Sequence, residues 1–504
     1  MASETTVSSD QAVSAADAIP FDNSYARLSE GFFIRWQPAE PAQRRLIEFN
    51  QPLAADLGLD ALPLEEREAV FSGASVPANA EPLAMAYAGH QFGNFVPALG
   101  DGRAILLGEI VDRHGIRRDL HLKGSGRTPF SRHGDGLCPL GPAIREYLVS
   151  EGLYALGVPS SRSLALALTG HTVVRESVSP GAVLTRVASG HVRVGTFQYF
   201  AARNDIDSVR ELADYVIERH YPELLGAEAP YLGLLRGLVR RQAELVAQWM
   251  NLGFIHGVMN TDNMTLAAET LDYGPCAFMD TYHPETVYSF VDQGGRYAYG
   301  NQPVMAQWNL TRFAECLLPL LAEDEQSAVD IAQPVIDEFG AYYEHARRVG
   351  MGAKLGLGEP REGDDDLVDG ILDALTRAEV DYTLFFRRLS AIAADPFQDA
   401  PVRELFAEGS LWDAWRERWQ QRLAAEGGEP QQRVQRMKRV NPAVIPRNHC
   451  VEQAIRAAED SGDFAPFRAL LSATAEPYAD HAEDVPGARP PAPEERVRQT
   501  FCGT

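Results

Sequence analysis

The sequence predicts an α+β protein in which a β-rich part is followed by a larger helical part. Two β-prone segments, 104–111 and 116–123, are joined by the turn-forming residues 112–115. After about residue 201 the pattern becomes helical, and large apolar residues recur at near-helical spacing from 234 to 249. With 504 residues, the chain is long enough to give each part its own core.

Composition shifts along the chain divide it into five expected parts. Residues 1–20 are rich in Ser, Ala, Asp and Thr, and we expect them to form a disordered tail. The other expected parts are an N-terminal extension over 21–93, a β-rich small lobe over 94–205, a helical large lobe over 206–423, and C-terminal helices with a proline-rich tail over 424–504.

Shorter elements are predicted within these parts. Helices are expected near 44–57, 64–71 and 137–156, and the two prolines of the last are confined to its start. A buried helix is expected to lead directly into residue 254. The acidic run 364–366 interrupts the helical pattern and is interpreted as a solvated loop.

Composition also limits the partners and the location. The formal net charge of -24 argues against nucleic acid, because binding phosphates requires a cationic face. No apolar run reaches transmembrane length, so we expect no membrane span and infer a cytoplasmic monomer. The five cysteines include no C-x-x-C pair, which indicates neither a zinc site nor a disulfide framework.

The most informative stretch is FIHGVMNTDNMTLAAETLDYGPCAFMD, residues 254–280. His256 and Asn263 have the spacing of the protein-kinase catalytic loop, H-x-D-x-x-x-x-N, and Asp272-Tyr273-Gly274 resembles the D-F-G turn. Together with the strands that precede it, this stretch predicts a two-lobed protein-kinase-like fold with N- and C-terminal extensions.

One position departs from the kinase pattern. The residue at the place of the kinase base is Val258, which accepts no proton, whereas an acid stands at Asp262. A carboxylate near a metal-bound triphosphate can orient a substrate hydroxyl and take its proton, which makes Asp262 the candidate base. Asp262 as a metal ligand, or as a loop residue contacting backbone, remains an alternative.

Asn263 and Asp272 are the candidate metal ligands. Magnesium prefers hard oxygen ligands and keeps some water, so one amide and one carboxylate with nucleotide oxygens form a plausible shell. The alternative is that Asn263 caps a local turn and Asp272 only begins the turn that follows.

Lys123 and Glu146 resemble the kinase lysine on the third strand and its partner glutamate on a helix. A buried lysine needs a counter-charge, and a paired ammonium can hold phosphate oxygens. Glu151 is a second candidate partner, and a surface lysine before a Gly-Ser-Gly turn is the alternative to the whole assignment.

The change at Val258 and Asp262 is specific enough to indicate a family. HGVMNTDNM followed by LDYGPCAFMD resembles the SelO (selenoprotein O) family, and the resemblance extends from about Phe21 to the C-terminal cysteine. It includes YAGHQFG, LGDGRA, KGSGRTPFSR and IREYL. The resemblance implies protein adenylylation, in which AMP moves from ATP to a Ser, Thr or Tyr hydroxyl of a protein and pyrophosphate leaves, with Mg²⁺ or Mn²⁺ as cofactor.

The resemblance also implies a nucleotide site. Its expected members are Gly100, Gly102, Arg103, Lys123, Asp135, Gly136, Arg186, Arg193 and Asp272. By itself a two-glycine turn indicates only a hairpin, and an isolated arginine is more often a surface residue. In the family the nucleotide lies reversed relative to a kinase, and cations around its β- and γ-phosphates would stabilise the departing pyrophosphate.

A redox pair is a further implication, because the family places a redox-active residue at the C-terminus. Cys276 follows Asp272 closely and Cys502 lies near the end of the chain, so a regulatory disulfide between them is a hypothesis. Two unrelated reduced thiols are the alternative.

Three other functions stay open at this point. An ordinary phosphotransferase is disfavoured by Val258, and a non-catalytic nucleotide-binding regulator is disfavoured by the retained lysine and metal residues. Transfer of UMP from UTP is the remaining alternative, because little in the sequence reads the base.

Overall fold

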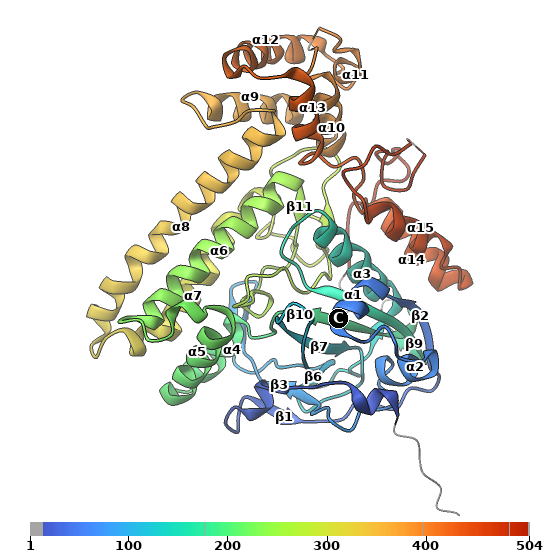
Figure 1. The fold of residues 1–504 in the computed structure, drawn as a ribbon, viewed down its shortest axis with the longest axis vertical. Helices are drawn as coiled ribbons and strands as arrows, with labels where there is room; N and C mark the ends of the chain where they lie inside the picture. Colours follow the sequence, from blue (N-terminus) through green and yellow to red (C-terminus); the bar gives the residue numbers. More distant parts are fainter. Residues whose placement is uncertain (1–13, 176, 396, 483, 502–504) are drawn as a thin grey trace, which may run out of the picture.

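The computed structural model describes residues 14–175, 177–395, 397–482 and 484–501. Helices account for 46% and strands for 15% of the residues, and the large sheet is antiparallel. Figure 1 shows the sheet in the lower part of the molecule, with one group of helices beside it and another beyond the end of the long helix α8. The mixed α and β composition predicted from the sequence is confirmed.

The large sheet has the strand order β1-β3-β6-β7-β10-β9-β2, with β8 paired to β10. The two predicted strands are β6 and β7, which pair antiparallel with Ala104 opposite Lys123. The strands of this sheet are β1 (Phe33–Arg35), β2 (Arg45–Phe49), β3 (Leu83–Met85), β6 (Ala104–Val111), β7 (Arg117–Lys123), β8 (Cys138–Pro139), β9 (Arg162–Val174) and β10 (Val178–Ala188).

Three of these strands come from the segment predicted to be an N-terminal extension, and one corrects a helix prediction. The helix expected over 44–57 is limited to α1 (Gln51–Leu57), because Arg45–Phe49 forms β2 and pairs with β9. Asn50 separates the two elements, since its side chain accepts a hydrogen bond from Leu53 N and caps the helix. Pairing with a distant strand therefore decides the structure of 45–49. The helix predicted over 64–71 is present as α2 (Leu64–Phe71).

The prediction of a disordered tail over 1–20 is wrong for residues 15–19. Residues 1–13 lie outside the described part, but Ala15–Ala18 form a short 3-10 helix. Ala16 and Ile19 are buried in the same core cluster as α1 and α2, and the carboxylate of Glu66 accepts a hydrogen bond from the Ser14 hydroxyl. Burial of two apolar side chains overrides the polar composition of this segment.

The buried helix predicted ahead of residue 254 is α6 (Pro230–Leu252). Leu234, Leu238, Leu245 and Trp249 are all buried along it, and it packs on α7 and α8 (Figure 1). It ends at Gly253, whose φ of 72° turns the chain into the short pair of strands β11 (Phe254–Ile255) and β12 (Ala277–Phe278). The other helices of this part of the chain are α4 (Val194–Ala201), α5 (Ile206–His220), α7 (Gln302–Leu321) and α8 (Glu325–Lys354).

The acidic run 364–366 is the first turn of a helix, not a solvated loop. It begins α9 (Asp364–Arg377), where carboxylates are favoured by the unpaired N–H groups of the helix start. Asp364 also pairs with Arg422, and Asp365 with Arg348. The helices that follow are α10 (Tyr382–Ile392), α11 (Ala400–Arg403), α12 (Gly409–Glu426) and α13 (Pro430–Lys438).

The helix predicted over 137–156 is α3 (Leu140–Ala155), which lies on β9 and β10. Its other side is covered by α14 (Asn448–Ser461) and α15 (Ala465–Thr474), as Figure 1 shows. Within the described residues, none of the helices combines the length and the apolarity that crossing a bilayer requires.

A buried lysine stands at the end of α8. Lys354 is 3% exposed, and its ammonium lies 4.2 Å from the ring centroid of Phe386 and 5.3 Å from that of Tyr382. The described residues place no carboxylate within ion-pair distance of it. Burial lowers the pKa of Lys354 to about 7, so the folded state disfavours the charged form.

We expect Lys354→Met to raise the free energy of unfolding by about 2 to 4 kcal/mol at pH 6.5. Because the pKa of Lys354 is lower in the folded than in the unfolded state, the penalty is complete below about pH 7 and shrinks as the pH rises toward 10.5. The gain should therefore be smaller at pH 9.5, as measured by urea unfolding at both pH values. Lys438→Met, which removes a lysine paired with Asp480, should give no gain at either pH.

Candidate active site

An ion pair connects Lys123, the last residue of β7, to Glu146 in the middle of α3. The ammonium of Lys123 lies 2.6 Å from a carboxylate oxygen of Glu146, and both side chains are buried. Glu151, the other candidate partner, instead binds Arg162 and Asn50. Burial alone would raise the pKa of Glu146, but Arg186 and Lys123 outweigh it and hold this pKa below its usual range. Glu146 is therefore a buried anion between two cations.

Asp272 is the centre of a cluster of cations. One carboxylate oxygen contacts Arg186 and lies 3.4 Å from the ammonium of Lys123, and the other lies 3.0 Å from the guanidinium of Arg193. These charges overcome the effect of burial and lower the pKa of Asp272 well below its usual range. Since Arg186 also binds Glu146, two carboxylates and three cations form one continuous network.

The backbone of Asp272 has the left-handed φ of 65°, a conformation that aspartate tolerates better than most residues. Just before it, the carbonyl of Leu271 lies 2.9 Å from Nε2 of His256. Burial lowers the pKa of His256, so the ring is neutral, and Nε2 must carry its proton because a carbonyl can only accept. His256 therefore fastens the start of the Asp-Tyr-Gly turn to the loop that carries Asp262.

Asn263 ends a short 3-10 turn over Thr261–Asn263. Its amide nitrogen donates to the carbonyl of Val258 at 2.9 Å. With the nitrogen committed to the backbone, the amide oxygen is the end of the side chain that suits a cation. Val258 thus contributes its backbone to the loop, although its side chain replaces the kinase base.

Asp262 is buried, with 8% of the residue exposed. Burial raises its pKa to about 6, against the opposing effect of Arg193. Its Oδ1 has no hydrogen-bond partner among the described residues, which is costly for a buried carboxylate. The raised pKa makes this carboxylate a stronger proton acceptor than an exposed aspartate.

Arg193 connects the two candidate acids. The same nitrogen donates to the Asp262 carbonyl at 2.7 Å and to the Asp272 carboxylate at 3.0 Å. Its guanidinium carbon lies 4.6 Å from the ring centroid of Tyr87, a cation–π contact. One fixed side chain therefore sets the spacing between the Asp262 loop and the Asp272 turn.

The expected glycine turn is held beneath a second loop. Gly100 has a φ of 64°, and a Cβ there would lie 2.3 Å from the Phe130 ring. The loop over 124–136 is bonded to the turn, since the Thr128 hydroxyl donates to the Asp101 carbonyl at 2.6 Å and the Ser131 hydroxyl donates to the Gly102 carbonyl. This packing accounts for the glycine at position 100.

Other predicted nucleotide residues lie around this loop. Gly136 packs so closely on the Gly126 backbone that a Cβ would lie 2.2 Å from it. The Arg103 carbonyl accepts a hydrogen bond from Gly124 N, next to Lys123. Asp135 is half-exposed and accepts hydrogen bonds of 2.7 and 2.8 Å from Arg175. The hydrogen bonds found for Asp135 thus do not join it to the Lys123–Asp272 network.

Of the two cysteines in the expected redox pair, Cys276 lies within the described residues. Cys276 is fully buried, its thiol donates to the Tyr273 carbonyl at 3.4 Å, and burial raises its pKa to about 12. Cys502 lies outside the described residues. The Thr500 hydroxyl donates to the Pro275 carbonyl at 2.6 Å, so the chain two residues before Cys502 reaches the residue before Cys276. The disulfide stays a prediction.

The segment that covers Asp262 was not predicted to belong to the site. A Cβ on Gly89 would lie 2.5 Å from Asp262 Oδ1, and His90 N donates to the Thr261 hydroxyl at 2.7 Å. Both residues belong to the YAGHQFG motif, which was a sign of the family but carried no assigned role. Close approach of a glycine to a carboxylate is a contact between distant segments, so the local pattern did not indicate it.

Glu146→Ala is expected to lower the free energy of unfolding by about 3 kcal/mol or more, because Lys123 and Arg186 would stay buried with one carboxylate fewer. Chemical unfolding followed by circular dichroism measures this. The matched control is Glu244→Ala, which breaks an exposed pair with Arg240 on α6 and should change stability by less than about 0.5 kcal/mol. Equal effects would contradict the account of the network.

Comparison with known proteins identifies the family of this chain. The family model described as protein adenylyltransferase SelO matches residues 16–475. A protein nucleotidyltransferase YdiU from Rhodopseudomonas palustris (strain ATCC BAA-98 / CGA009) is 58% identical over 487 residues, 96% of this chain and 99% of that protein. The protein of the same name from Bradyrhizobium sp. (strain ORS 278) is 55% identical with the same coverage. The chain therefore belongs to the protein adenylyltransferase SelO family.

Proposed function

We propose that this protein transfers AMP from ATP to Ser, Thr or Tyr hydroxyls of other proteins and releases pyrophosphate. Family membership and the names of its relatives support nucleotidyl transfer to protein. The observation that carries the proposal is the position of Asp262. This residue is buried, and Arg193 hydrogen-bonds both to its backbone carbonyl and to the carboxylate of Asp272. On this proposal, Asp262 would accept the proton close to the cations that would bind the phosphates.

Lys123, Arg186 and Arg193 are the proposed triphosphate ligands. All three bind carboxylate oxygens of Asp272, and phosphate oxygens engage the same donors in the same way. Arginine forks also suit a leaving pyrophosphate, on which negative charge builds up. The glycine turn at 100–102, Arg103, Asp135 and Gly136 complete the proposed nucleotide site, by analogy with the family.

Asn263 and Asp272 are the residues that would hold Mg²⁺ or Mn²⁺. Among the described residues, no three His, Cys, Asp or Glu side chains converge on one point. That fits magnesium, which is commonly held by one or two protein oxygens together with substrate phosphates. When bound, the metal neutralises charge on the phosphates. Asp272 would then exchange its contacts with arginine for contacts with the cation.

The fold is proposed to be kinase-like and two-lobed, with 94–205 as the small lobe and 206–423 as the large lobe. The order of a strand lysine, a helix glutamate, a catalytic loop and an Asp-Tyr-Gly turn supports this fold.

Asp262 is the proposed base. The side chain of Val258 cannot accept a proton, which disfavours an ordinary phosphotransferase. A pKa near 6 leaves Asp262 ionised at neutral pH yet more basic than an exposed aspartate.

Labelled ATP distinguishes the possible reactions. With magnesium and a mixture of client proteins, label from the α-phosphate should remain on protein, whereas label from the γ-phosphate should not. Retention of the γ-label would indicate a kinase, and neither label on protein would indicate a regulator. Parallel reactions with α-labelled UTP report whether uridylyl transfer competes.

Asp262→Asn should lower kcat for this transfer by about 10²- to 10⁴-fold, the usual contribution of general acid–base catalysis. ATP binding, measured by calorimetry, should change little, since the amide keeps the shape of the carboxyl group. Asp272→Ala should abolish transfer and guards against a contaminating activity. Full activity in Asp262→Asn would remove this residue from the mechanism.

Removing the metal tests the Asn263–Asp272 assignment. EDTA should abolish transfer, and excess Mg²⁺ or Mn²⁺ should restore it. Asn263→Ala should raise the metal concentration for half-maximal activity by about tenfold, because one oxygen ligand is lost. An unchanged metal requirement in Asn263→Ala would exclude the amide as a ligand.

A further inference from the structure

The hairpin of β4 (Gly89–Gln91) and β5 (Asn94–Val96) is fastened to the loop that carries Asp262. His90 N donates to the Thr261 hydroxyl at 2.7 Å, and Phe92 N donates to Asn260 Oδ1 at 3.0 Å. Gly89 lies against Asp262 itself. A peptide resting on this hairpin would therefore lie within a few residues of the proposed base.

Beside the hairpin, aromatic rings and two arginines form a continuous surface, which we call the arginine-framed surface. The guanidinium carbons of Arg296 and Arg312 lie 4.7 and 5.2 Å from the ring centroid of Trp308. The His90 ring meets Trp308 edge-on at 5.2 Å and lies 5.0 Å from the ring of Phe95, which is 40% exposed. The surface thus joins the hairpin to α7 and to the loop before it.

A shallow depression adjoins this surface. It has a volume of about 320 Å³ and is lined by His90, Phe95, Gln198, Arg312 and Glu315, together with the small residues Ala201, Ala202 and Cys316. Gln198 is held in place from both sides, since its amide nitrogen lies 2.8 Å from Nδ1 of His90 and its amide oxygen accepts the Thr261 hydroxyl. The depression can take a side chain from a bound peptide without disturbing the hairpin.

The charge of the arginine-framed surface is positive and only partly compensated. Within the described residues, the Glu315 carboxylate lies 2.5 Å from the Arg312 guanidinium, whereas no carboxylate lies within 4.0 Å of the Arg296 guanidinium. The nearby carboxylate of Asp292 instead accepts a hydrogen bond from the Arg296 backbone N at 2.9 Å. The Arg296 side chain lies against the Tyr297 hydroxyl, and the Nε atoms of both arginines have no hydrogen-bond partner in the described part of the chain. Burial and the two arginines lower the pKa of His90, so the ring adds no charge.

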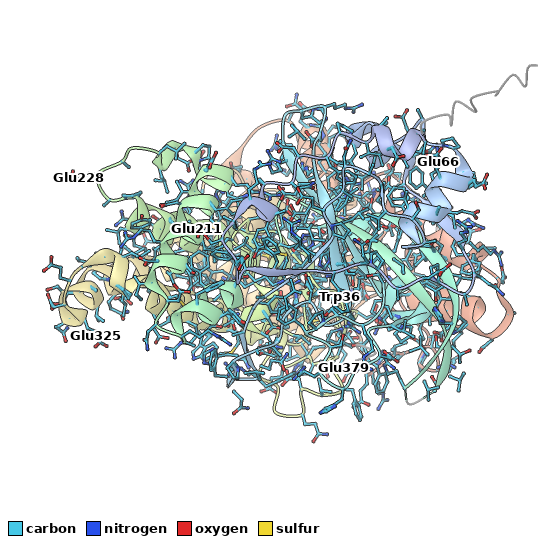
Figure 2. The ribbon with its side chains drawn as sticks, turned by 90° about the horizontal axis from the view of Figure 1, so that it is seen from below. Trp36, Glu66, Glu211, Glu228, Glu325 and Glu379 are labelled. Atoms are coloured by element: carbon cyan, nitrogen blue, oxygen red, sulfur yellow. The ribbon has the colours of Figure 1, made fainter. Side chains whose placement is uncertain are left out.

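This positive surface contrasts with the rest of the protein. The chain has a formal net charge of -24, and exposed glutamates such as Glu228 and Glu325 lie at the outer edge of the helical part (Figure 2). The net negative charge of the chain disfavours an acidic partner in general, whereas the two guanidinium groups attract one here. Tryptophan and arginine are also the residues that contribute most often to binding at protein interfaces.

We propose that the arginine-framed surface binds an acidic segment of the client protein and so selects hydroxyls that are flanked by Asp or Glu. Guanidinium groups pair with carboxylates through two parallel hydrogen bonds, and the aromatic rings cover the stems of the bound side chains. The selection of hydroxyls rests on the proposed function, whereas binding of the acidic segment does not. A nucleic acid strand is disfavoured, because its evenly spaced phosphates would extend onto the acidic surroundings.

Peptide binding to the full-length protein, without nucleotide, tests the proposal. Two fluorescein-labelled peptides of one sequence are compared by anisotropy, one with Asp and Glu around a central Ser and one with Asn and Gln in their place. The acidic peptide should bind at least tenfold more tightly. Arg296→Gln/Arg312→Gln should abolish that preference, and Arg312→Gln alone, which alters a partly exposed side chain, should reduce it.

The matched control is Arg236→Gln/Arg240→Gln, which removes two exposed arginines from α6. It should keep the full preference. Equal binding of both peptides by the wild-type protein, equal loss in the control, or tighter binding of a single-stranded oligonucleotide than of the acidic peptide would each overturn the proposal. A preference for the acidic peptide that persists both in Arg312→Gln and in a folded Arg296→Gln/Arg312→Gln variant would also overturn the proposal.

Transfer kinetics separate this inference from the proposed function. With the acidic peptide as acceptor, Arg296→Gln/Arg312→Gln should raise its KM at least tenfold and leave kcat and the KM for ATP unchanged. If the wild-type protein shows the binding preference but transfers no label, the proposed function fails and the docking surface stands. If it transfers label equally well to both peptides, the docking inference fails and the proposed function stands.

Discussion

The network around Asp272 is the interaction on which the rest of the site depends. Its charges come from β7, α3, β10, the residue before α4 and the turn at 272. Ions buried this deeply are tolerated only when each has its partners, and removing one leaves the others uncompensated. The network therefore holds the sheet, α3 and the Asp-Tyr-Gly turn in a single arrangement. It also gathers the proposed triphosphate ligands Lys123, Arg186 and Arg193 in one place.

The C-terminal helices support the same network from behind α3. Arg145, the neighbour of Glu146, donates to the Cys276 carbonyl and to Asn448 at the start of α14. The orientation of α3, and with it the position of Glu146, is thus tied both to the segment after Asp272 and to the C-terminal part of the chain. Residues that contact no substrate on the proposed scheme still fix the geometry of those that do.

Much of the site could be predicted because its members stand in short, spaced motifs. The intervals from His256 to Asn263 and from there to Asp272 identified the loop and the turn, and Lys123 followed from its place at the end of a strand. The sequence favoured Glu146 as the partner of Lys123 but left Glu151 as a second candidate. Both lie on α3, and only the packing of that helix decides which carboxylate faces Lys123 and which faces Arg162.

The sequence by itself determined the elements whose signals are local: α6 with its buried stripe, the strands β6 and β7 with their turn, and the motif carrying Asp262, Asn263 and Asp272. Tertiary structure alone decided that 45–49 is a strand, that Ala16 and Ile19 are buried, and that the hairpin from Gly89 covers Asp262. The physical reason is that such features arise from contacts between segments far apart in the chain. The local sequence pattern of one segment does not indicate which distant segment it will contact.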